Sequence, residues 1–93
     1  MQKVMYFHLD TCPYCRQADE VIQELIQEHP EYARVQFEKV DENEHPEIAA
    51  QYDYMANPSM FIGHEKLYEA HIGEKKAETR EKVEKVLKRA LED

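Results

Sequence analysis

Thr11-Cys12-Pro13-Tyr14-Cys15-Arg16 contains both cysteines of this 93-residue chain, with two residues between them. A disulfide closes over two intervening residues where the backbone brings the two Cβ atoms within about 4 Å, and the first turn of a helix can do this. Pro13 suits such a turn, because its φ angle is already set and its missing N–H would have had no partner there. The stretch therefore predicts a dithiol pair at the beginning of a helix.

The two cysteines are expected to differ in chemistry. Cys12 would be the N-cap residue, beneath the unpaired backbone N–H groups and the positive end of the helix dipole, with Arg16 as a nearby cation. These features favour the thiolate, which is the nucleophile in disulfide exchange. Cys15 lies one turn further along and is expected to be shielded from solvent. It would attack only after a mixed disulfide has formed at Cys12.

Zinc binding is the main alternative use of the cysteines. A closed zinc site requires four ligands, and the chain has no second cysteine pair. Histidines could complete such a site, but no two are separated by the usual three to five residues. The five histidines are His8, His29, His45, His64 and His71. A redox dithiol is therefore favoured, and a non-catalytic redox-sensing or zinc-binding module is the rival interpretation.

Length, charge and hydropathy limit the domain organisation and the partners. Residues 1–93 suffice for one domain, and a net charge of −8 argues against nucleic acid and against an anionic membrane surface. No segment approaches the roughly 18 apolar residues of a membrane helix. Residues 1–3 lead into a strand-like stretch rather than a signal peptide. Because both cysteines are placed for chemistry and none is left for structural bridges, we expect the reducing cytoplasm as the location. We also expect the protein to be a monomer.

Strand and helix patterns alternate in the order β-α-β-α-β-β-α. Strands are expected over 3–9, 34–40, 59–62 and 66–72. Helices are expected from Pro13 up to Pro30, over 46–52, and in a last segment with apolar residues at helical spacing over 83–91. A right-handed crossover makes the first two strands parallel, and the last two form an antiparallel hairpin. The pattern predicts an α/β fold with a four-stranded mixed sheet flanked by three helices.

This element order, with Cys-Pro-Tyr-Cys after the first strand, resembles the thioredoxin fold over the whole chain. The quartet is similar to that of glutaredoxins, whereas residues 40–52 are more similar to the middle of thioredoxins. Pro58, just before the third strand, matches the cis-proline of the family. By this resemblance, Asn57 and Pro58 form a ledge that binds the substrate across from the dithiol, while Pro13, Tyr14 and Arg16 support the active site.

The resemblance implies a thiol–disulfide oxidoreductase that reduces protein or glutathione-mixed disulfides. Its redox group would be the Cys12–Cys15 disulfide, with no bound cofactor and no metal. A thioredoxin-reductase-like protein or glutathione would return the electrons, and glutathione could also be a co-substrate. The chain departs from glutaredoxins at Leu9, where they carry lysine, and over 73–76, which does not reproduce their stretch for the glutathione carboxylate.

Several neighbouring side chains have simpler expected places. Tyr14 is expected to be exposed and to contact partners. His8 and Asp10 flank the motif, where they could assist proton transfer or serve only as strand and loop residues. The remaining aromatic residues near these strands are expected in the core rather than on a binding surface. They are Tyr6, Phe7, Phe37 and Phe61.

Overall fold

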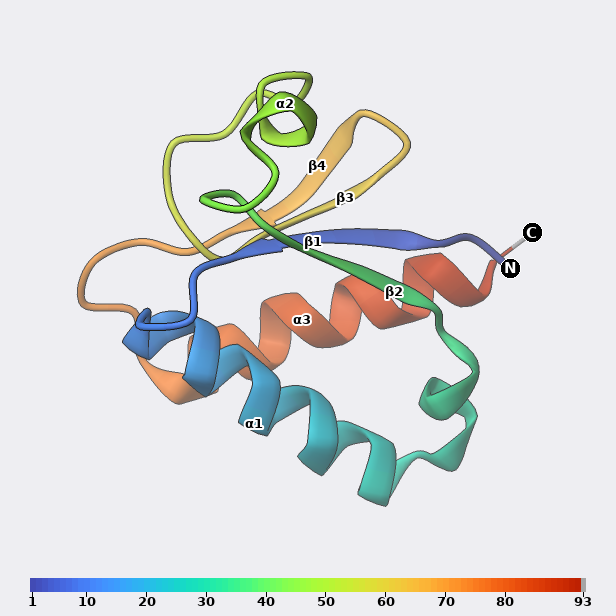
Figure 1. Cartoon of the computed structure of the whole chain (residues 1–93). Helices are drawn as coiled ribbons and strands as arrows, with labels where there is room; N and C mark the ends of the chain where they lie inside the picture. The colour runs from blue at the N-terminus through green and yellow to red at the C-terminus, as the bar shows by residue number, and fades with distance from the viewer. Residues whose placement is uncertain (93) are drawn as a thin grey trace.

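The computed structural model describes residues 1–92, which form a four-stranded sheet with helices on both faces (Figure 1). In chain order the elements are β1 (Val4–His8), α1 (Pro13–Glu28), the 3-10 helix η1 (Pro30–Arg34), β2 (Phe37–Asp41), α2 (Pro46–Ala49), β3 (Ser59–Ile62), β4 (Glu65–Glu69) and α3 (Lys76–Leu91). The strand order is β2-β1-β3-β4. β1 is parallel to β2, and the pairs β1–β3 and β3–β4 are antiparallel. The predicted mixed sheet and hairpin are confirmed.

The central strand β1 supplies both cores. Val4 and Tyr6 belong to the large apolar cluster shared with α1 and α3, whereas Met5 and Phe7 belong to a smaller cluster next to α2. Successive side chains of a strand point to opposite faces, so one continuous apolar strand can fill both layers. Figure 1 shows α1 and α3 side by side below the sheet and α2 above it. β1 is therefore held between α1 and α3 on one face and α2 on the other, and this packing positions the dithiol motif that follows β1.

The predicted strand over 34–40 is wrong at its beginning. Arg34 is the last residue of η1, and β2 begins at Phe37. Pro30 has the fixed φ angle of a first helical turn, and the short helix buries Tyr32 in the large cluster. This burial stabilises a helical turn that extends to Arg34, the first residue of the predicted strand. Phe37, predicted in the core, is only partly buried and packs against its edge.

Two further elements end earlier than predicted. α2 ends at Ala49, and Tyr52 packs instead against Phe7, with ring centroids 4.9 Å apart. β4 ends at Glu69, and residues 70–75 form a loop that leads to α3. In both places the chain leaves the regular element earlier than its local sequence pattern predicts.

The packing of α1 can be tested at Leu25, which is fully buried in the large cluster. We expect Leu25→Ala to lower the free energy of unfolding by about 2–5 kcal/mol, because the change removes buried methyl groups and leaves a cavity. Urea unfolding followed by circular dichroism measures the loss. Leu91→Ala, at the half-buried end of α3, is the matched control and should cost clearly less. Equal losses at the two positions would contradict the described packing.

Candidate active site

Cys12 is the N-cap residue of α1, as predicted. Its backbone is extended, Pro13 follows in the first turn, and the Cys15 N–H donates to the Cys12 Sγ atom at 3.2 Å. The N-terminal N–H groups of a helix lack partners within the helix and bind anionic or electron-rich groups. The sulfur of Cys12 therefore satisfies one of these donors, at a half-exposed position that solvent reaches.

Cys15 lies behind Cys12 and is 4% exposed, so its predicted shielding is confirmed. Burial, and next a hydrogen bond with Cys12, raise the pKa of the Cys15 thiol to about 12. A backbone hydrogen bond with Leu9 lowers this pKa by less, and the nearby charges of Cys12 and Asp19 raise it by smaller amounts still. Cys15 is therefore a protonated thiol at neutral pH, and both cysteines are free in this structure.

The Asn57–Pro58 peptide bond is cis, as predicted, and it lies against the first cysteine. The Cys12 thiol donates to the Asn57 carbonyl oxygen at 3.6 Å. The Asn57 side-chain amide donates to Glu42 at 3.0 Å, and its Oδ1 atom is buried with no hydrogen-bond partner within residues 1–92. Residues 45 positions apart in sequence thus meet at one sulfur atom.

Tyr14 differs from the expected exposed residue. It is half-buried against the large cluster, and its hydroxyl accepts a hydrogen bond from the Gly73 N–H at 2.6 Å. Pro13 and Arg16 are exposed. The loop over 70–75, which no sequence pattern placed beside the motif, binds the Tyr14 hydroxyl and covers part of its side chain.

Glu74 holds that loop in place, and sequence reasoning missed it. Its carboxylate is buried and accepts hydrogen bonds from the Tyr68 and Thr79 hydroxyls and from the His71 N–H. Gln17 of α1 donates to Thr79 Oγ1 at 2.9 Å and to the Glu74 carbonyl at 3.4 Å. A glutamate followed by two lysines is typical of a solvated surface, so the sequence carried no signal of this role.

A cavity of about 210 Å³ opens beside the two cysteines. Its walls come from the end of β1, the dithiol loop, α1 and β2. The lining residues are His8, Leu9, Asp10, Cys12, Cys15, Arg16, Asp19 and Lys39. The structure therefore brings His8, Asp10 and Arg16 to the dithiol, as expected from their positions, and adds Asp19 and Lys39.

Within residues 1–92, one group of three side chains has the composition and closeness of a metal site. His71, Glu74 and Glu78 each offer a ligand atom, and these atoms lie within 4.8 Å of one another. The cluster contains neither cysteine, and Lys82 already pairs with Glu78 at 2.6 Å. The zinc interpretation of the cysteines thus gains no further ligands from this cluster.

Comparison with known proteins agrees with this geometry. The family model described as Thioredoxin matches residues 1–89. No curated protein matches the chain in sequence.

Solved structures share the fold at low identity. A thioredoxin from Fasciola hepatica is 24% identical with a TM-score of 0.62, and the match covers 94% of this chain and 78% of that one. Thioredoxin 1 from Thermosipho africanus TCF52B is 21% identical with a TM-score of 0.58, over 97% and 99% of the two chains. A malarial protein is 17% identical with a TM-score of 0.60, over 96% of each chain. Since the family model spans nearly the whole sequence, the chain belongs to the thioredoxin family.

Proposed function

We propose that this chain reduces the disulfides of proteins through the Cys12/Cys15 dithiol. The observation that carries the proposal is the asymmetric pair: a half-exposed sulfur at a helix N-cap and a buried thiol one turn behind it. Membership of the thioredoxin family indicates thiol–disulfide redox chemistry in general, and proteins of this family typically need no cofactor. The pair supplies a nucleophile and a resolving group within one turn of helix.

The reaction needs two exchanges. The Cys12 thiolate attacks one sulfur of the substrate disulfide, the substrate S–S bond breaks, and the displaced sulfur takes up a proton. Cys15 then attacks Cys12 Sγ, and the second substrate sulfur leaves with its electron pair and is protonated. The substrate gains two electrons and two protons, and the protein is left with a Cys12–Cys15 disulfide.

The surroundings of Cys12 favour a polypeptide substrate. The Asn57 carbonyl lies 3.6 Å from the Cys12 sulfur and can pair with the backbone of an extended chain. Met55 and Ile72 are 96% and 94% exposed, in the two segments that contact the motif at Cys12 and at Tyr14. Exposed apolar side chains beside a reactive group suit apolar residues of a partner protein.

Glutathione is the second candidate substrate, and the structure favours it less. Leu9 lines the cavity where glutaredoxins carry lysine, and Glu74 turns its carboxylate inward to Tyr68 and Thr79. The loop over 70–75 therefore has no buried cation that could bind a carboxylate of glutathione. We therefore propose a thioredoxin-reductase-like protein as the electron donor, with glutathione as the alternative.

Partner class and location follow from the same features. Among the described residues, no helix has the length and apolar character needed to cross a membrane. A net charge of −8 disfavours nucleic acid as a partner. We propose that the protein acts as a monomer in the cytoplasm, where a dithiol is kept reduced between turnovers.

Serine substitutions separate the two cysteines. We expect Cys12→Ser to abolish reduction of a protein disulfide such as that of insulin, because the attacking sulfur is lost. Cys15→Ser should instead accumulate a mixed disulfide with the substrate at Cys12, visible by mass spectrometry. The wild-type protein and a glutathionylated peptide substrate are the controls. Retained activity in Cys12→Ser, or about one zinc per chain in freshly purified protein, would contradict the proposal.

Alkylation tests the difference in acidity. With iodoacetamide at pH 8, we expect the reduced protein to be labelled at Cys12 and to remain largely unlabelled at Cys15, whose thiol is buried and has a raised pKa of about 12. Only the thiolate reacts, so labelling of Cys15 should increase about tenfold per pH unit from pH 8 to 11. Peptide mapping measures both sites, and unfolded protein is the control. Equal labelling at pH 8 would refute the assignment.

A further inference from the structure

The resolving step of the proposed function requires a proton acceptor for Cys15. Its thiol is 4% exposed and protonated at neutral pH, yet it must attack as a thiolate once the mixed disulfide has formed. A side chain that accepts this proton must lie within reach of the thiol, directly or through one solvent molecule. The cavity beside the cysteines is where such a group has to be.

Asp19 occupies that place. It lies four residues after Cys15 on α1, so both side chains lie on one face of the helix, and both line the cavity of about 210 Å³. The Tyr6 hydroxyl lies between them, 2.8 Å from Asp19 Oδ1 and 3.2 Å from the Cys15 carbonyl oxygen. Tyr6 thus holds the carboxylate beside the backbone of Cys15, and the charge of Asp19 is near enough to act on the pKa of the Cys15 thiol.

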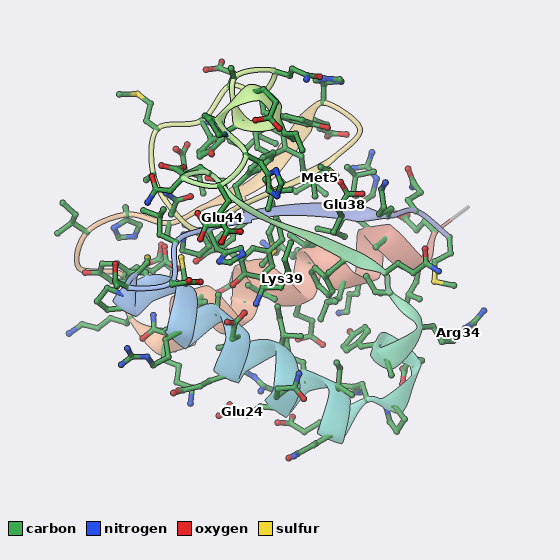
Figure 2. All side chains as sticks on the ribbon, in the orientation of Figure 1. Met5, Glu24, Arg34, Glu38, Lys39 and Glu44 are labelled. Atoms are coloured by element: carbon green, nitrogen blue, oxygen red, sulfur yellow. The ribbon has the colours of Figure 1, made fainter. Side chains whose placement is uncertain are left out.

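Lys39 of β2 fixes the same carboxylate from the other side. Its Nζ atom lies 3.3 Å from each oxygen of Asp19 and 5.1 Å from the centre of the Tyr6 ring. Figure 2 shows Lys39 reaching from β2 toward α1. The Lys39 and Asp19 side chains are 47% and 46% exposed. An ion pair this exposed adds little to stability, but it restricts the orientation of the Asp19 carboxylate.

The other ionisable groups around Cys15 are poorer acceptors. Arg16 is a cation, and burial followed by hydrogen bonds to carboxylates raises the pKa values of Tyr6 and Tyr68. Glu74 already accepts hydrogen bonds from two hydroxyls and one N–H group. His8 and Asp10 line the same cavity, but Asp19 is the carboxylate whose charge acts on the pKa of the Cys15 thiol and which Tyr6 holds beside the Cys15 backbone.

We propose that Asp19 accepts the Cys15 proton in the resolving step, with Tyr6 and Lys39 positioning its carboxylate. The proton passes to Asp19 directly or through solvent, for which the cavity has room, since one water occupies about 30 Å³. The sulfur electron pair of Cys15 forms the bond to Cys12 Sγ while the bond from Cys12 to the substrate breaks. The departing substrate thiolate is then protonated, and Asp19 returns its proton through solvent.

Release of thionitrobenzoate tests the proposal, because it separates the two steps. Reduced protein mixed with less than one equivalent of Ellman's reagent should release one thionitrobenzoate as Cys12 attacks and a second as Cys15 resolves. In Asp19→Asn we expect an unchanged first phase and a second phase slowed about 100-fold at pH 7. The slowed phase should then accelerate about tenfold per pH unit. Glu20 lies on the same helix as Asp19, and its charge faces Lys76 of α3. Glu20→Gln should leave both phases unchanged.

A faster second phase in Asp19→Asn would indicate that Asp19 acts on Cys15 only through its charge. The negative charge of Asp19 contributes to the raised pKa of the Cys15 thiol, so removing that charge alone would speed the second phase. A second phase that is faster or unchanged in Asp19→Asn would overturn the proposal. So would a larger slowing in Asp10→Asn than in Asp19→Asn. Loss of the first phase in the wild-type protein would instead refute the proposed dithiol function itself.

Discussion

The hydrogen bond from the Cys15 N–H to the Cys12 sulfur is the contact on which the site depends. It caps α1 with a cysteine where a serine or aspartate would usually accept the same donor. This hydrogen bond marks the end of the loop after β1 and the beginning of α1. It also joins two cysteines that lie one helical turn apart. Cys12 lies at the helix end, whereas Cys15 lies on the buried face of α1 with Ala18, so the two cysteines differ in exposure.

The sheet gives this cap its setting. β1 is held between β2 and β3, so the loop that follows β1 emerges beside the segment that precedes β3. That segment carries Asn57, whose carbonyl oxygen meets the Cys12 sulfur. The motif and its ledge are far apart in sequence and adjacent because their strands are paired. The reactive sulfur is thus bounded by two rigid elements and one loop.

The loop before α3 depends on a buried carboxylate. Glu74 accepts from hydroxyls of β4 and α3 and from its own loop, and such a buried acceptor is costly to leave unpaired. Gln17 of α1 and the hydroxyl of Tyr14 join the same loop to the active-site helix. The conformation around Ile72, which we place at the substrate surface, is therefore fixed from within the fold rather than by its own sequence.

Local sequence determined the dithiol motif, the order of the elements and two of the strand pairings, β1 with β2 and β3 with β4. Spacing of Cys12, Pro13 and Cys15 predicts the helix start, because capping and the φ angle of proline are properties of a few adjacent residues. The apolar run of β1 predicts a strand buried on both faces. Through its resemblance to the family, Pro58 predicts the cis bond that the structure contains.

Only the tertiary structure decided where elements stop and which distant groups meet. η1, held by the burial of Tyr32, includes Arg34, the first residue of the predicted strand. The Tyr14 hydroxyl is bound by the Gly73 N–H, which comes from a loop distant in sequence. Asp19 and Lys39 each have the sequence character of surface charges. Their place beside Cys15 arises from packing α1 against the sheet, since contacts across elements depend on register and helix orientation, which local propensity does not specify.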